Sequence, residues 1–246
     1  MTISKITLAA ALAASALVAT PALAQDAPAD GLTVTGSATI VSDYRFRGIS
    51  LSDRDATIQG GFGVSHDSGF YVGTWGSGLS GFGSFGGSNT EIDVYGGYTT
   101  DLGGMTVDVG LLWYLYPGTT GTDYAEPYAS VSGAFGPLEA KVGVAYAPDQ
   151  DAIGSDDNLY VFTDVSAAIP ETPLTLKAHY GYTDGSLGGL NGSYSDWSIG
   201  ASASWKALNF GVSYVDTSIS KGDDLFMDPT RKIAQDGVVF SIGASF

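Results

Sequence analysis

Residues Trp197 to Trp205 read Trp-Ser-Ile-Gly-Ala-Ser-Ala-Ser-Trp, a strict alternation of apolar with small or polar side chains. Successive side chains of a β-strand point to opposite faces of the sheet, so this segment has one apolar and one polar face. The same period of two runs from Leu32 to Arg47 and from Val238 to Phe246. No segment after residue 24 keeps the period of a helix. The sequence therefore predicts an all-β protein.

Twelve such segments can be traced along the chain. They begin near Leu32, Thr57, Phe70, Thr90, Met105, Tyr124, Leu138, Asn158, Leu174, Tyr194, Leu208 and Gly237. Short turns, such as 66–69 and 135–137, alternate without a break with longer loops, such as 77–89 and 217–236. Short turns at one end and long loops at the other are typical of up-and-down barrels. We therefore predict a twelve-stranded antiparallel up-and-down β-barrel.

Three features indicate that the apolar face of this barrel points outward into lipid. Twelve strands enclose a lumen that is too wide for the many glycines of the polar face to fill, since side chains fill a barrel of about eight strands. Apolar-face aromatics gather near the strand ends, with Phe70 and Tyr98 at the short turns and Tyr44, Phe46 and Trp113 toward the long loops. Such belts mark both membrane interfaces. An even strand count also permits full closure, so the prediction is a transmembrane barrel.

The N-terminus has the features of a cleavable signal peptide. Lys5 precedes an apolar run from Ile6 to Val18, and Ala22 and Ala24 form a small-x-small cleavage site. We expect a signal peptide over residues 1–24, a barrel over residues 25–246 and export to the cell outer membrane.

Composition excludes several classes of function. The 246 residues include no Cys, and 26 acidic against 10 basic residues give a formal charge of −16. The lack of Cys excludes disulfides and thiol catalysis, and the acidic excess argues against nucleic acid as a partner. Neighbouring Ser65, His66 and Asp67 point apart on a strand or tight turn, so no catalytic relay is expected. We predict no enzyme activity, no cofactor and no metal site, and we expect the loop acids to form a solvated surface rather than a calcium site.

Two parts of the chain resemble known outer-membrane proteins. Residues Val238–Phe246, which end in Phe, resemble the terminal strand of bacterial outer-membrane proteins. The run Ser37–Ser50 is similar to the opening of the TorF porin family, and Asp53–Phe62, Ser68–Ser77 and Glu91–Tyr98 continue this similarity. The resemblance implies a porin-like barrel whose last strand, ending at Phe246, is bound by the barrel-assembly machinery.

Charged residues on the polar faces are the candidate functional residues, because parity points them into the lumen. The candidates for a charged constriction are Asp43, Arg45, Arg47, Glu91, Asp93, Asp108, Glu126, Lys141, Asp164, Lys177 and Asp196. Basic residues opposite acids would set a transverse field in a pore. The same residues would equally form ion pairs that fill the lumen and serve stability alone. With Glu139 included, acids outnumber bases, which predicts a weak cation preference.

The leading interpretation is a monomeric outer-membrane barrel for passive diffusion of small hydrophilic solutes or ions. The alternative is a non-conducting structural or adhesion barrel whose loops bind partners. The two hypotheses differ in whether the lumen is open.

Overall fold

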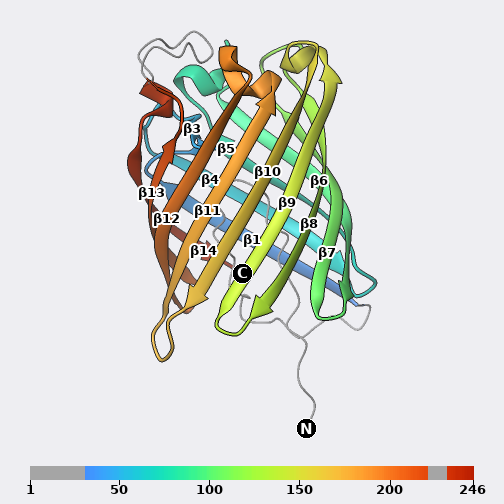
Figure 1. Ribbon diagram of the computed structural model, residues 1–246, viewed down its shortest axis with the longest axis vertical. Coiled ribbons are helices and arrows are strands. Elements are labelled where there is room, and N and C mark those ends of the chain that lie inside the picture. Colours follow the sequence, from blue (N-terminus) through green and yellow to red (C-terminus); the bar gives the residue numbers. More distant parts are fainter. Residues whose placement is uncertain (1–30, 221–231) are drawn as a thin grey trace.

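The computed structural model describes residues 31–220 and 232–246, in which twelve strands form a closed antiparallel barrel (Figure 1). The barrel strands are β1 (Leu32–Val41), β4 (Thr57–His66), β5 (Phe70–Gly78), β6 (Thr90–Leu102), β7 (Met105–Leu115), β8 (Tyr124–Phe135), β9 (Leu138–Gln150), β10 (Asp156–Ala168), β11 (Leu174–Gly185), β12 (Ser193–Trp205), β13 (Leu208–Thr217) and β14 (Gly237–Ser245). Two short strands, β2 (Arg45–Phe46) and β3 (Ile49–Ser50), pair only with each other. The predicted twelve-stranded up-and-down barrel is confirmed.

The barrel closes where the first strand meets the last. Strand β1 pairs with β4 on one side and with β14 on the other, from Ser37 opposite Ser245 to Val41 opposite Ser241. At the end of this seam, the Phe246 N–H donates to the Gly36 carbonyl oxygen over 2.9 Å. All the other neighbouring barrel strands follow one another in the sequence. The wall is therefore continuous and has no open sheet edge.

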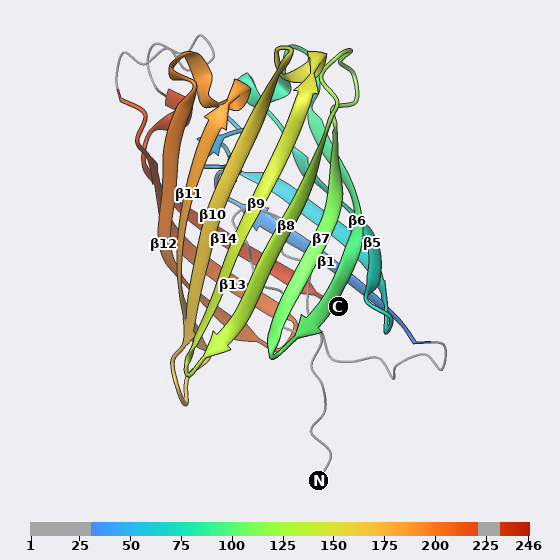
Figure 2. The same ribbon diagram turned by 45° about the vertical axis from the view of Figure 1, so that its right-hand side comes forward.

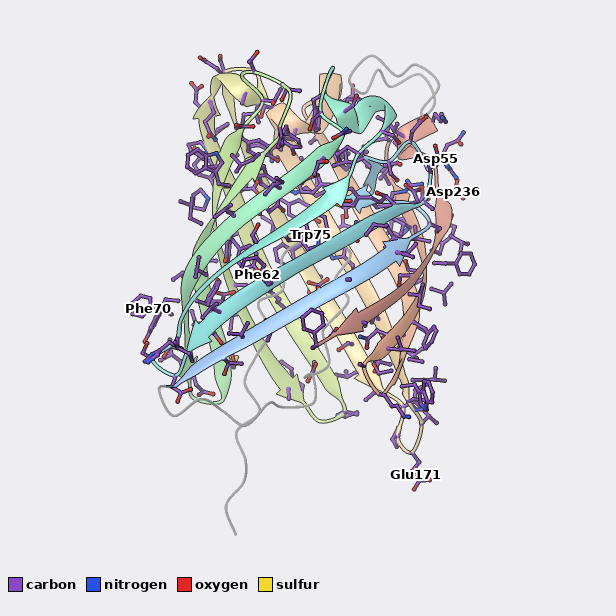
Figure 3. All side chains as sticks on the ribbon, turned by 180° about the vertical axis from the view of Figure 1, so that it is seen from behind. Asp55, Phe62, Phe70, Trp75, Glu171 and Asp236 are labelled. Atoms are coloured by element: carbon purple, nitrogen blue, oxygen red, sulfur yellow. The ribbon has the colours of Figure 1, made fainter. Side chains whose placement is uncertain are left out.

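The outward face of the wall is apolar. Large apolar side chains stand exposed on it, among them Ile199 (66 % exposed) and Val142 (57 %). Exposed aromatics lie near the strand ends, with Phe70 and Trp205 beside the turns and Trp113 toward the loops; Phe70 projects from the rim in Figure 3. A closed barrel with an apolar exterior between aromatic belts matches the lipid-facing surface of membrane barrels.

Several glycines of the inward face make room for aromatic rings of the neighbouring strand. A Cβ built on Gly143 would collide with the ring of Phe162, and one built on Gly110 would collide with that of Tyr128. Each ring occupies the space that a side chain at the glycine would need. The lumen is therefore lined by aromatic rings as well as by small and charged side chains.

The two ends of the barrel differ. Short turns lie at one end, hereafter the turn end, and the longer connections lie at the other, hereafter the loop end (Figures 1 and 2). Figure 3 shows Glu171 in a turn at the turn end and Asp55 and Asp236 at the loop end. Within residues 31–220 and 232–246, no helix is long and apolar enough to cross a membrane. The predicted signal peptide, residues 1–24, lies outside the described residues.

One part of the predicted wall is wrong. Strand β1 ends at Val41, and the following residues leave the wall and turn into the barrel. Tyr44 is only 1 % exposed and packs edge-on against Trp75, with the ring centroids 5.5 Å apart, while Phe46 packs against Tyr114. These two aromatics therefore lie inside the barrel and not in the lipid-facing belt. The alternation of side chains continues past Val41, so parity alone does not reveal where the chain leaves the sheet.

Candidate functional site

A short hairpin inside the barrel, formed by residues 43–55 and hereafter the inner hairpin, is the candidate functional site. Strands β2 and β3 pair through Arg45 opposite Ser50 and Phe46 opposite Ile49. The two residues between them, Arg47 (φ 47°) and Gly48 (φ 80°), are both left-handed, as a type I′ turn requires. This conformation is strained for Arg, at a cost of about 1–3 kcal/mol. Surrounding contacts must therefore hold Arg47 at the tip.

The Arg47 guanidinium is held by an acid of the opposite wall. Its Nη2 lies 2.7 Å from both carboxylate oxygens of Glu126 on β8, and the Tyr114 hydroxyl donates to the same carboxylate over 3.0 Å. The guanidinium also lies 4.2 Å from the centre of the Tyr160 ring. The Tyr194 hydroxyl donates to the Arg47 carbonyl over 3.0 Å. Four wall strands, β7, β8, β10 and β12, thus position the tip of the inner hairpin.

Arg45 binds within the inner hairpin and to the last loop. Its Nε lies 2.6 Å from the Asp43 carboxylate, and its Nη1 donates to the Gly48 carbonyl over 2.9 Å and to the Gln235 carbonyl over 2.8 Å. Ser50 donates its hydroxyl to the other oxygen of Asp43 over 2.6 Å. The inner hairpin is therefore fixed on its outer side by the segment that precedes β14.

Apolar packing fills the lumen around the inner hairpin. Tyr44 and Leu51 belong to a buried cluster with wall and loop residues. The other buried members of this cluster are Val41, Leu79, Leu112, Tyr114, Tyr116, Tyr124, Ala147 and Ile153. Ile49 packs in a second cluster with Tyr194, Ile219, Ile233 and Ala234. The interior of the loop-end half of the barrel is therefore closely packed and dry, like the core of a globular protein.

Two acids beside the inner hairpin have no counter-charge. Glu91 and Asp93 project inward from β6, with exposed fractions of 0 % and 5 %. Among the described residues, no hydrogen-bond partner meets either carboxylate oxygen of Glu91 or Oδ1 of Asp93. Burial raises the pKa of the neighbouring Tyr44, and the charges of Glu91 and Asp93 raise it further. An ionised carboxylate without a partner is costly in such surroundings.

A third group of charges lies deeper in the lumen, around His179 on β11. Its Nδ1 lies 2.7 Å from Asp164 and its Nε2 lies 3.1 Å from Asp196 and 2.9 Å from the Tyr160 hydroxyl. A carboxylate at each ring nitrogen fits an imidazolium that donates to both acids. The Asp164 side chain is 37 % exposed, so water reaches this level of the lumen.

The predicted constriction residues do not form a single ring. Arg47 and Glu126 pair at the tip of the inner hairpin, Asp43 and Arg45 pair within it, and the other residues are spread along the wall. Asp108 accepts a hydrogen bond of 2.6 Å from the Tyr71 hydroxyl. Lys141 lies 5.6 Å from the centre of the Phe162 ring and opposite Asp164, and Lys177 lies toward the turn end of β11.

Sequence reasoning missed the aromatic residues of the site. Trp75, Tyr114, Tyr124 and Tyr160 all lie against the inner hairpin or its partners. Tyr114 and Tyr160 occupy the polar parity of β7 and β10, and this was the available signal that large rings enter the lumen. In the described part of the chain, no group of three or more His, Asp or Glu side chains is arranged to hold a metal ion.

Comparisons with known proteins agree with this architecture. The NanC porin structure matches at 13 % identity with a TM-score of 0.56, over 87 % of this chain and 99 % of that chain. The KdgM porin matches at 7 % identity with a TM-score of 0.57, over 87 % and 98 % of the two chains. No curated protein matches the sequence. Residues 25–246 match the family described as bacterial protein of unknown function (Gcw_chp), and the chain therefore belongs to that family.

Proposed function

We propose that the protein is an outer-membrane channel for passive diffusion of small hydrophilic solutes or ions. The observation that carries this proposal is a closed barrel with an apolar exterior and an interior of charged and polar side chains. Lipid solvates such an exterior, and water reaches the lumen at the level of Asp164. The shared fold of the NanC and KdgM porins supports the same function.

A weak cation preference follows from the charges that remain after pairing. Arg47 offsets Glu126, and Arg45 offsets Asp43. Lumen-facing acids still outnumber bases among the remaining residues, which are Glu91, Asp93, Asp108, Glu139, Asp164 and Asp196 against Lys141, Lys177 and His179. An acid-rich path concentrates cations, and salt screens this effect over about 10 Å at 0.1 M.

Planar-bilayer recording tests the channel and its selectivity together. Stepwise currents are expected from the purified protein, with a reversal potential under a salt gradient that indicates cation preference and declines as salt rises. The double variant Arg45→Ala/Arg47→Ala should strengthen this preference. Anion selectivity in the wild type that disappears in the double variant would show that these two arginines, and not the excess of acids, control selectivity.

The second candidate function is a non-conducting structural or adhesion barrel with partner-binding loops. The packing around Tyr44, Ile49 and Leu51 favours it, because these buried side chains occupy the loop-end half of the lumen. Silence in planar bilayers together with binding of a cell-surface partner would support this function over the channel.

We also propose how the protein reaches the outer membrane. The signal-like residues 1–24 direct export, and the barrel-assembly machinery binds the final strand together with the terminal Phe246. We expect the barrel to act as a monomer, and its wall needs no strand from a second copy of the chain. The resemblance to the TorF porin family remains a prediction that is compatible with this fold.

A further inference from the structure

We infer that the inner hairpin, residues 43–55, is a displaceable plug of the channel and that the Arg47–Glu126 ion pair is its latch. This inference rests on the proposed channel function. In the closed conformation described above, the Arg47 and Glu126 side chains are 1 % and 2 % exposed, whereas the Asp164 side chain deeper in the lumen is 37 % exposed. The dry, closed segment of the pathway therefore coincides with the inner hairpin.

The base of the inner hairpin allows it to move as a unit. Val41 at the end of β1 is directly opposite Thr57 at the start of β4, so the ends of the hairpin segment are neighbours in the wall. The backbone–backbone hydrogen bonds of the inner hairpin to the rest of the barrel are few, such as that from Ser80 N–H to the Leu51 carbonyl over 3.1 Å. Its other polar contacts involve side chains, including Arg47 with Glu126 and Arg45 with Gln235. The hairpin can therefore leave the lumen while the ladder of the wall remains intact.

The closed conformation combines a strong latch with local costs, as a two-state element requires. The buried Arg47–Glu126 pair, in which Nη2 of Arg47 contacts both carboxylate oxygens of Glu126, favours it. Against it act the left-handed φ of Arg47 and its Nε and Nη1, which have no hydrogen-bond partner among the described residues. Glu91 and Asp93 are buried without a cation partner in this conformation, so their hydration would favour an open one. These opposing contributions make opening accessible.

A disulfide lock tests the movement directly, because the natural chain has no Cys. A Cβ built on Gly48 at the hairpin tip would press against Cγ2 of Thr217 on β13, so Gly48→Cys/Thr217→Cys brings two thiols together between plug and wall. The φ of 80° strains a Cys at the first position, so the reduced lock variant is compared with the wild type before oxidation. The control is Thr175→Cys/Ser202→Cys, which joins opposite residues of β11 and β12 within the wall. Far-UV circular dichroism checks that every variant retains its strands.

Single-channel recording then compares oxidised with reduced protein. We expect currents from the wild type, from both states of the control and from the reduced lock variant, and at least a tenfold lower open probability from the oxidised lock variant. Equal currents from its oxidised and reduced states would overturn the inference of a plug but not the proposed channel function. Silence of the wild type, the reduced lock variant and a latch-broken variant together would overturn the channel, and the plug with it.

Two matched substitutions test the latch without a disulfide. Glu126→Gln and Glu91→Gln each remove one buried, inward-facing acid, but only Glu126 pairs with Arg47. Loss of the latch should raise the open probability by about tenfold or more, whereas Glu91→Gln leaves the Arg47–Glu126 pair intact and should not raise it. A mere change of lumen charge would move both variants in the same direction, and that result would overturn the assignment of the latch.

Discussion

Arg45 and Arg47 are two residues apart and carry the same side chain, yet their partners differ in kind. Arg45 pairs over 2.6 Å with Asp43, which is only two positions away in the chain. Arg47 pairs with Glu126, which is 79 residues away, and also lies over the ring of Tyr160. The position over the Tyr160 ring suits a planar guanidinium better than an ammonium group. At the residue scale, Arg47 is therefore the side chain that joins the inner hairpin to the wall.

Arg47→Ala should destabilise the protein strongly, because it leaves the buried Glu126 carboxylate without its cation. Removal of one partner of a buried ion pair lowers the free energy of unfolding by about 3–5 kcal/mol. Urea unfolding in detergent measures the loss. The control Arg54→Ala removes a more exposed guanidinium that contacts Gln235, and it should cost no more than about 1 kcal/mol. Equal midpoints for the two variants would contradict the role of Arg47.

The strands place lipid-facing and lumen-facing side chains next to each other along the chain. Ile199 is exposed on the outward face of β12, and its neighbour Ser198 faces inward, opposite His179 of β11. Gly143 on β9 is also an inward position, but the Phe162 ring covers it. A larger side chain at Gly143 would therefore have to displace that ring. Register and ring packing decide which inward sites have space.

At this scale, Ile199→Arg and Val142→Arg should each lower the free energy of unfolding by about 2–4 kcal/mol if they lie at the bilayer midplane, because they place a charge against lipid. Ser198→Asn, one residue from Ile199, keeps a polar group in the lumen and should cost less than about 1 kcal/mol. Unfolding in lipid vesicles compares the three variants. A cost for Ser198→Asn as large as that for Ile199→Arg would reverse the assignment of the two faces.

The whole barrel has a direction, because its turns and its long loops lie at opposite ends (Figure 2). Outer-membrane barrels keep their short turns in the periplasm and their longer loops outside the cell. The inner hairpin begins and ends at the loop end, between Val41 and Thr57. The plug would thus close the channel from the cell exterior.

Cysteine labelling on intact cells tests this orientation. Thr120→Cys lies in an exposed long loop and should react with a membrane-impermeant thiol reagent. Ser68→Cys lies in the exposed turn between β4 and β5 and should react only after the outer membrane is permeabilised. The wild-type chain, which has no Cys, supplies the background. Labelling of Ser68→Cys on intact cells would invert the barrel.

The sequence by itself determined the wall of this protein. A strand has a side-chain period of two, so the alternation within a segment such as Trp197–Trp205 shows which of its faces is apolar. Regular alternation of short and long connections then defined the number of strands and their up-and-down order. These are local properties, and each can be recognised within one hairpin.

Only the tertiary structure decided what lies inside the wall. Tyr44 and Phe46 continue the outward parity of β1, yet they are inside because Ser42 is the last residue to bond β14, through Phe240, and the next residues turn inward. The contact between Arg47 and Glu126 depends on closure of the barrel, which brings β8 across the lumen from the hairpin. Alternation records the face of a strand but not the point at which the chain leaves the sheet. Pairing across a lumen is a property of the closed cylinder and of no single segment.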